Sequence, residues 1–249
     1  MEPVMVNLTE YDETRYQRQM LIAGWGEEGQ RRLKASRVFL AGAGGLGSPV
    51  SVYLAIAGVG ELRICDSDRS ELSNLNRQML HSDERLGEWK TVSAKETLQR
   101  LNPTITITTC HDRLESSNVN GIVGKPDIMV DCLDNFETRY VLNRYAVSTG
   151  IPLIHGAIWG MAGQVTFLHP PETPCLRCLF PEEPPKAVFP VVGASPGLAG
   201  CIQAMEVLKF LTMVGANLKG RLLVFDGEEM TFDLLTVRRR PSCPDCGSL

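Results

Sequence analysis

A glycine-rich loop between an apolar run and a helical segment restricts the fold of this chain more than any other feature. Residues 42–47 read Gly-Ala-Gly-Gly-Leu-Gly and separate a strand-like run at 38–41 from a helical pattern at 47–57. Glycines allow a tight turn and a close approach to phosphate, and the first amides of a helix are free to bind an anion. The loop therefore predicts the phosphate-binding turn of a Rossmann-like unit. On its own it fits NAD or FAD as well as ATP.

The rest of the first half alternates between strand-like and helical segments. Apolar or β-branched runs occur at residues 61–65, 105–109 and 127–130, and helical patterns occur at 90–101 and 137–149. Strands separated by helices of this length form right-handed crossovers in a mostly parallel sheet. We expect an α/β fold with a doubly wound, Rossmann-like sheet.

The second half changes character after Pro152. Strand-like runs at 153–157 and 163–168 precede a proline-rich stretch, residues 170–196, which cannot form long helices or central strands and predicts a loop or lid. The remaining elements are a helix, an antiparallel pair of strands near the C-terminus, and a polar helical preface ahead of the core, at residues 198–214, 222–225 with 232–237, and 10–35.

Two Cys-x-x-Cys pairs lie in this second half, Cys175 with Cys178 and Cys243 with Cys246. A two-residue spacer lets both sulfurs of a pair reach one metal at about 2.3 Å, so two such pairs match a tetrahedral zinc site. The spacing predicts a structural zinc site with four cysteine ligands, which holds the C-terminal tail and takes no part in catalysis. Two disulfides or two redox pairs are the alternatives.

Polar side chains gather at the predicted carboxyl ends of the strands. Asp66 ends the second strand, where a carboxylate can accept hydrogen bonds from ribose hydroxyls. The others are Asp68, Asn74, Arg77, Lys90 and Asp134. A hydride-transfer site needs an apolar nicotinamide pocket, whereas a triphosphate site uses Arg and Lys to offset phosphate charge and Asp to hold Mg²⁺. The set therefore favours ATP with Mg²⁺ over NAD.

The charge balance and hydropathy narrow the partners and the location. A net charge of −4 gives no basic field for nucleic acid or anionic lipid. The sequence has no run of about eighteen apolar residues and no basic targeting start. We expect a cytoplasmic protein with no nucleic-acid or membrane partner. Cys65, Cys110 and Cys132 lie in apolar contexts and are expected to be buried, reduced thiols; His155 is expected to be structural.

Several motifs in a fixed order give the chain a family resemblance. They are residues 15–19 (Arg-Tyr-Gln-Arg-Gln), 42–47, 66–68 (Asp-Ser-Asp), 74–78 (Asn-Leu-Asn-Arg-Gln), Lys90, Asp134 with Asn135, and both cysteine pairs. Together, from about Tyr11 to Cys246, they resemble the MoeB/ThiF/HesA branch of the ubiquitin-activating-enzyme superfamily.

This resemblance implies ATP-dependent adenylation of the C-terminal glycine of a small ubiquitin-like sulfur-carrier protein ending in Gly-Gly. Pyrophosphate is released, and the acyl-adenylate serves later thiocarboxylate formation. The family's nucleotide loop and ribose ligand match Gly42, Gly44, Gly45, Gly47 and Asp66, with Asp68 beside it. Its phosphate ligands match Asn74, Arg77 and Lys90, and its Mg²⁺ ligand matches Asp134. Arg15 resembles a catalytic, phosphate-binding arginine delivered from the neighbouring subunit, which implies a homodimer.

The resemblance also implies a single ATP-binding adenylyltransferase domain over residues 1–249. Its parts are the helical preface at 1–35, a nucleotide-binding half at 36–157, and a carrier-binding half with the zinc site at 158–249.

The chain departs from the family after the first cysteine pair. Many members carry a cysteine in this loop that forms a thioester or persulfide-linked intermediate, whereas residues 183–193 contain none. The nearest is Cys201, in what reads as the first turns of a helix, where a helix N-terminus can lower a thiol pKa; packing against the core is the other interpretation. We expect adenylation without an obligatory thioester on this chain and sulfur from a separate donor. A non-catalytic carrier-binding scaffold and an NAD-dependent oxidoreductase are the alternatives.

Overall fold

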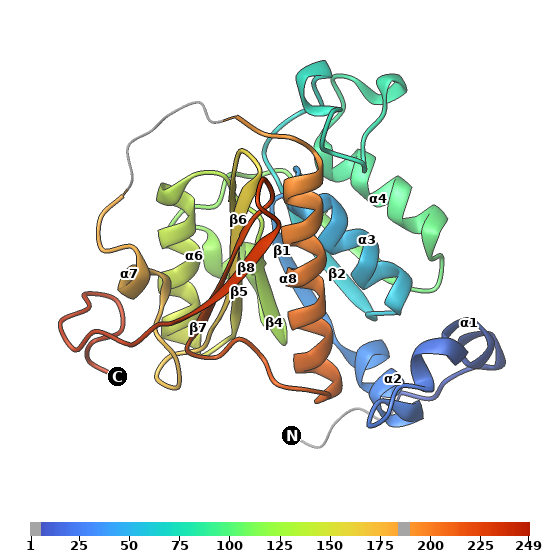
Figure 1. Cartoon of the computed structure of the whole chain (residues 1–249). Coiled ribbons are helices and arrows are strands. Elements are labelled where there is room, and N and C mark those ends of the chain that lie inside the picture. Colours follow the sequence, from blue (N-terminus) through green and yellow to red (C-terminus); the bar gives the residue numbers. More distant parts are fainter. Residues whose placement is uncertain (1–5, 184–189) are drawn as a thin grey trace.

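The computed structural model describes residues 6–183 and 190–249, and its strands form one sheet (Figure 1). Their order across the sheet is β3-β2-β1-β4-β5-β6-β7-β8. The strands are β1 Arg37–Ala41, β2 Glu61–Cys65, β3 Thr106–Cys110, β4 Ile128–Asp131, β5 Leu153–Trp159, β6 Ala162–Leu168, β7 Arg221–Asp226 and β8 Thr231–Thr236. The pairs from β3 to β5 are parallel and those from β5 to β8 are antiparallel. The predicted mostly parallel sheet with an antiparallel C-terminal portion is confirmed.

The strand order reverses at β1 and places two loops side by side. The chain goes from β1 to β2 on one side, whereas β4 returns to the other side of β1. In a doubly wound sheet, a crevice opens outside the carboxyl ends of the strands at such a switch point. The glycine loop follows β1 and residues 132–135 follow β4, and Cys132 N donates to Ala41 O at 2.9 Å. The switch point is therefore where a ligand site is expected.

Helices cover both faces of the sheet because side chains of a strand alternate in direction. Val38 and Leu40 of β1 pack on one side and Phe39 on the other. The first face is covered by α2 Gly26–Ala35, α3 Gly47–Ala57, α4 Lys90–Leu101 and α8 Ala194–Thr212, and the second by α5 Val119–Val123, α6 Phe136–Thr149 and α7 Leu176–Leu179. Among the described residues, no helix is long and apolar enough to cross a bilayer.

The preface is helical as predicted, whereas the proline-rich stretch contains more helix than predicted. The preface is helical and consists of α1 Glu10–Met20, which begins at a Thr9 capping box, and α2. The proline-rich stretch is not a loop throughout, because it contains α7 and because α8 begins four residues before the predicted position 198. Pro196 fits the first turn of α8, where its missing N–H would have no helical partner. Residues 184–189 of the predicted lid lie outside the described residues.

Candidate functional site

Two glycines of the loop are required by the backbone itself. Gly42 has a φ of +109°, and a Cβ on it would lie 2.6 Å from the carbonyl oxygen of Cys132. A Cβ on Gly47 would lie 2.1 Å from the carbonyl oxygen of Gly42. Any side chain at either position would therefore break the close approach between the glycine loop, the start of α3 and the loop after β4.

The space around Gly44 and Gly45 is different, because side chains rather than backbone surround them. A Cβ on Gly44 would meet only the Gln78 side chain, at 3.5 Å, and one on Gly45 would come within 3.3 Å of Pro196. Both glycines line a cavity of about 840 Å³ that lies outside the carboxyl ends of the strands. Glycine at these two positions keeps the backbone accessible to a ligand in the cavity, as a phosphate-binding turn requires.

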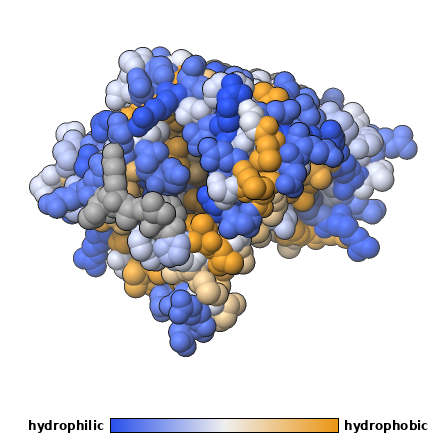
Figure 2. Space-filling model, turned by 90° about the horizontal axis from the view of Figure 1, so that it is seen from above, coloured by the Kyte–Doolittle hydropathy of each residue, from blue (hydrophilic) through white to orange (hydrophobic). Residues whose placement is uncertain are grey.

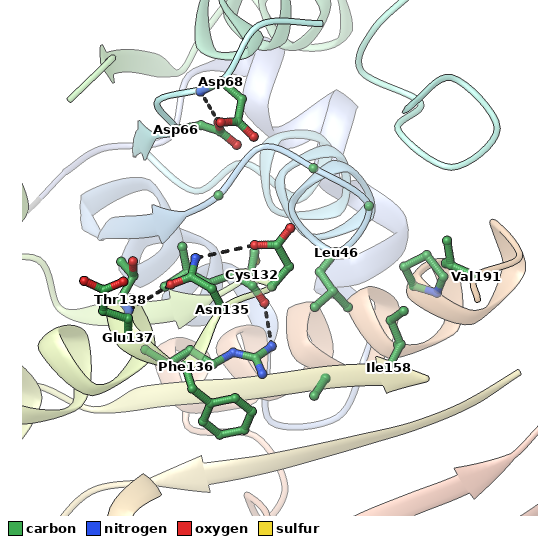
Figure 3. A pocket seen from close by; sticks show the side chains of 18 of the residues that line it. Leu46, Asp66, Asp68, Cys132, Asn135, Phe136, Glu137, Thr138, Ile158 and Val191 are labelled. Atoms are coloured by element: carbon green, nitrogen blue, oxygen red, sulfur yellow. Dashed lines mark hydrogen bonds between the residues drawn. The ribbon is translucent and has the colours of Figure 1, made fainter. Parts of the chain in front are cut away.

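The cavity joins a charged part to an apolar part. Figure 2 looks onto this side of the molecule and shows a hollow flanked by hydrophilic and hydrophobic residues. Its charged lining includes Asp66, Asp68, Arg77, Lys90 and Asp134, and its apolar lining includes Leu46, Phe136, Ile158, Phe180 and Val191. Figure 3 shows the two parts, with Asp66 and Asp68 beyond the glycine loop and Phe136 and Ile158 on the other side. The apolar lining comes mainly from the segment after β4 and from the antiparallel part of the sheet. No sequence motif predicts this apolar part of the cavity.

Asp66 ties the end of β2 to the glycine loop. Its Oδ2 accepts from Ala43 N at 2.8 Å and its Oδ1 accepts from Asp68 N at 2.9 Å. Burial raises the pKa of this carboxyl group above its usual value, against the charge of Lys90 and the two backbone hydrogen bonds. The predicted ribose ligand is thus at the cavity, fixed by main-chain donors.

Lys90 and Asp68 form an ion pair at the edge of the cavity. Lys90 is the first residue of α4 and is buried, and its Nζ lies 2.9 Å from Oδ2 of the exposed Asp68. Asn74, in the short 3-10 helix Leu72–Asn74, lines a smaller neighbouring cavity of about 440 Å³ together with these two residues, but it does not line the main cavity. Of the predicted phosphate ligands, Lys90 therefore lines both cavities, whereas Asn74 lines only the smaller one.

Arg77 and Gln78 approach the glycine loop from the same segment. Arg77 lines the cavity and donates to Ser73 O and Asn76 Oδ1, both at 2.9 Å. Gln78 is buried and lines the cavity as well, and its Oε1 has no hydrogen-bond partner among the described residues. The sequence analysis gives Gln78 no role beyond its place at the end of the motif at residues 74–78. Its position after Arg77 in a recognised motif was the only signal for it.

The loop after β4 brings Asp134 to the other side of the glycine loop. Asp134 is exposed and lines the cavity, and Asn135 Nδ2 lies 3.5 Å from its Oδ1. Asn135 is also the N-cap of α6, because its Oδ1 accepts from Thr138 N at 2.9 Å. An exposed carboxylate that lines the same cavity as Arg77 and Lys90 is suited to hold a divalent cation.

Arg15 lies away from the cavity of its own chain. It is on α1, where its Nη1 donates to Tyr11 Oη at 3.1 Å and its Nη2 donates to Leu101 O. It is not among the residues that line either cavity.

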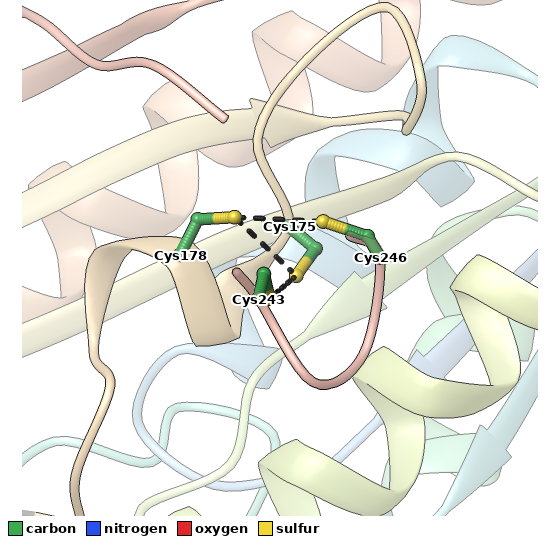
Figure 4. Close-up of side chains that lie close together, drawn as sticks. All are labelled: Cys175, Cys178, Cys243 and Cys246. Atoms are coloured by element: carbon green, nitrogen blue, oxygen red, sulfur yellow. Dashed lines mark hydrogen bonds between the residues drawn. The ribbon is translucent and has the colours of Figure 1, made fainter. Parts of the chain in front are cut away.

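The four cysteines of the two pairs converge into one cluster (Figure 4). Their Sγ atoms lie within 4.8 Å of one another, with separations of 3.6 Å for Cys175 to Cys243 and 3.5 Å for Cys178 to Cys246. Ligands at about 2.3 Å from a tetrahedral metal are about 3.8 Å apart, so the cluster fits a metal ion. An S–S bond is about 2 Å long, and all eight cysteines of the chain are free. The disulfide alternative is therefore wrong for this structure.

Cys201 lies inside α8 and not in its first turns, because the helix begins seven residues earlier, at Ala194. Burial raises the pKa of its half-buried thiol, against a hydrogen bond with Tyr53. The alternative in which a helix N-terminus activates Cys201 is therefore wrong, and the structure agrees with packing against the core. His155 is fully buried, and its Nδ1 lies 2.7 Å from Asp131 Oδ2, which agrees with the structural role expected of it.

Comparison with known proteins gives the same family as the motifs. The ThiF family model matches residues 16–245. The chain is 46% identical to the SAMP-activating enzyme E1 of Haloferax volcanii, over 94% of this chain and 88% of that protein. It is also 46% identical to the sulfur carrier protein adenylyltransferase of Thermus thermophilus, over 94% of this chain and 90% of that protein. A crystal structure of E. coli MccB with ATP matches with a TM-score of 0.85 and 25% identity, over 96% of this chain and 76% of that one. These relatives confirm the predicted adenylyltransferase activity, and the chain belongs to the ThiF family.

Proposed function

We propose that this protein catalyses the ATP-dependent adenylation of the C-terminal glycine of a ubiquitin-like sulfur-carrier protein. The observation that carries the proposal is the cavity itself, in which an open glycine turn faces Arg77, Lys90 and Asp134 and continues into an apolar part. The names of the relatives from Haloferax and Thermus, which refer to SAMP activation and to a sulfur carrier protein, support the same substrate class.

Each residue at the cavity has a binding role that follows from its charge and position. The backbone at Gly44 and Gly45 receives phosphate, and Asp66 accepts hydrogen bonds from ribose. Arg77 and Lys90 offset the phosphate charge, with Asn74 beside them. Asp134 would hold Mg²⁺, which would offset the negative charge of the phosphates and of the departing pyrophosphate.

The chemistry needs positioning more than a proton acceptor. A carboxylate is already a nucleophile, so the carrier's C-terminal oxygen can attack the α-phosphorus once the two are held in line. A new C–O–P linkage forms, and the bond between the α- and β-phosphates breaks. The apolar part of the cavity, near Phe136 and Ile158, would receive the carrier tail. Two glycines suit this passage because they add no side chains.

The remaining assignments belong to the same proposal. Zinc binds the four-cysteine cluster and has a structural role. Arg15 contacts phosphate in the cavity of a neighbouring subunit, because it does not line the cavity of its own chain. The active form is then a homodimer. The sulfur for the thiocarboxylate comes from a separate donor, since Cys201 lacks the surroundings of a reactive thiol.

ATP–pyrophosphate exchange tests this function. Purified protein is assayed with recombinant β-grasp proteins that end in Gly-Gly, and each is paired with a version that lacks the last two glycines. Exchange should require the intact tail. Arg77→Ala and Asp134→Ala should each reduce it by at least about 100-fold, because one member of a cooperating set can cost orders of magnitude in rate. Exchange at the wild-type rate in either variant, or with tail-less carriers, would contradict the proposal.

A further inference from the structure

Both main-chain polar groups of Leu133, the residue before Asp134, are held by one buried ion pair. The N–H of Leu133 donates to Asp131 Oδ1 at 3.0 Å, and its carbonyl accepts from Arg139 Nη2. On the other side of Asp134, Asn135 is anchored as the N-cap of α6. The backbone of Asp134 is therefore fixed at both ends, while its side chain stays exposed at the cavity.

Arg139, in the first turn of α6, links the loop after β4 to the middle of β5. Its Nη2 also donates to the carbonyl of Gly156 in β5 at 3.0 Å, and its Nε lies 3.4 Å from Asp131 Oδ2. The centre of the Phe136 ring is 5.1 Å from its guanidinium carbon. A guanidinium group offers five donors in a planar fork, whereas an ammonium group offers a compact point charge. Lysine at this position would keep the charge and lose the geometry.

The ion pair is buried, with Arg139 among the residues that line the cavity. Asp131 is fully buried, its Oδ2 accepts from His155 Nδ1 at 2.7 Å, and its main-chain carbonyl accepts from Gln203 Nε2 at 2.8 Å. Burying each charge costs several kcal/mol, and well-packed apolar residues often give equal or greater stability. A gain in stability therefore does not explain why charged residues occupy this buried position. Their effect on the geometry of the loop after β4 is a better explanation.

We propose that Arg139 is a positioning residue for metal binding: with Asp131 it fixes the peptide before Asp134, so that the Asp134 carboxylate meets the nucleotide-bound cation in one orientation. The inference rests on the proposed function, because it requires Asp134 to hold the cation. The same loop touches the glycine turn, since the Cys132 carbonyl packs against Gly42. The ion pair thus sets the distance between the cation ligand and the phosphate turn.

Binding of Mn²⁺, measured by electron paramagnetic resonance with the ATP analogue AMPCPP, tests this role without a carrier protein. Arg139→Lys should weaken Mn²⁺ binding by about 10-fold or more, as changes to groups that orient metal ligands do. AMPCPP affinity without metal should change by less than about twofold. The control is Arg144→Lys, an exposed arginine on the same helix, which should bind Mn²⁺ like the wild type.

A double-mutant cycle separates positioning from a general structural role. If Arg139 acts through Asp134, Arg139→Lys should add nothing to the Mn²⁺ defect of Asp134→Asn. Asp131→Asn keeps the acceptor for Leu133 but loses the negative charge facing Arg139, so it should also weaken Mn²⁺ binding. This second variant carries the test if Arg139→Lys does not fold.

Three results would overturn the inference: wild-type Mn²⁺ affinity in Arg139→Lys or Asp131→Asn, additive defects in the cycle, or an equal loss of metal-free AMPCPP affinity. If the wild-type protein with AMPCPP binds no Mn²⁺, or if Asp134→Asn binds it normally, the proposed role of Asp134 fails first. The two failures are therefore distinguishable.

Discussion

Removal of the zinc proposed for the four-cysteine cluster should destabilise the protein by an amount that depends on the length of chain between the cysteines. Cys178 and Cys246 are 68 residues apart in sequence, with β7 and β8 between them, and their Sγ atoms lie 3.5 Å apart. A cross-link that closes a loop of this length removes chain entropy worth about 4 kcal/mol from the unfolded state. For a domain of this size, about 4 kcal/mol corresponds to a fall in Tm of about 8–16 °C.

The cluster lies apart from the nucleotide cavity, so the loss should be one of stability more than of binding. None of the four cysteines lines the cavity. Cys243→Ser should therefore lower Tm by the amount above and leave AMPCPP affinity at room temperature within about twofold of the wild type, as for distant sites.

Differential scanning fluorimetry and elemental analysis together measure this effect. Protein kept reduced should contain one zinc per chain, and a strong chelator at elevated temperature should release it and lower Tm. Cys201→Ser is the matched control, because Cys201 is outside the cluster. Purified protein without a tightly bound metal, or an unchanged Tm after its removal, would refute the reasoning.

Further predictions follow from the glycine loop, the preface and α8. Gly44→Ala should fold normally and lose at least about 10-fold in ATP affinity, because a methyl group there would meet the Gln78 side chain and occupy the cavity rather than clash with backbone. Gly47→Ala should lose about 3 kcal/mol of stability in urea unfolding, because its Cβ would clash with the backbone. The reverse pattern would be inconsistent with this geometry. Burial opposes ionisation of Asp12, but hydrogen bonds from Lys34 and from Thr9 hold its pKa below the usual value. The contribution of Asp12 to stability is thus present above the unfolded pKa of about 3.9 and lost as the pH falls below it. Asp12→Asn should therefore flatten the pH dependence of the urea midpoint between about pH 5 and pH 3. Parallel plots of midpoint against pH for the wild type and the variant would argue against this role. Cys201→Ser should keep full carrier-dependent exchange, whereas a carrier thioester on Cys201, seen by mass spectrometry, would speak against the proposed sulfur route.

Local sequence determined the elements and the motifs. The strands of the parallel core and the helices at 47–57 and 90–101 were predicted to within a residue or two, because their periodicity agrees with the environment in which they fold. The glycine loop and the cysteine pairs were equally clear, since each depends on a short spacing. These features predicted a Rossmann-like nucleotide protein and a four-cysteine cluster before any contact was known.

Only the tertiary structure decided which distant residues meet. Asp131, Arg139 and His155 look ordinary in the sequence, and their enclosure depends on β4 and β5 pairing beside α6. The early start of α8 was hidden by Pro196 and its neighbouring glycines, which lower helix propensity although packing on the sheet stabilises the helix. Spacing along the chain specifies local geometry, but burial and ion pairing depend on contacts between segments far apart in sequence. For that reason the nucleotide turn was readable from the sequence, and the network behind Asp134 required the fold.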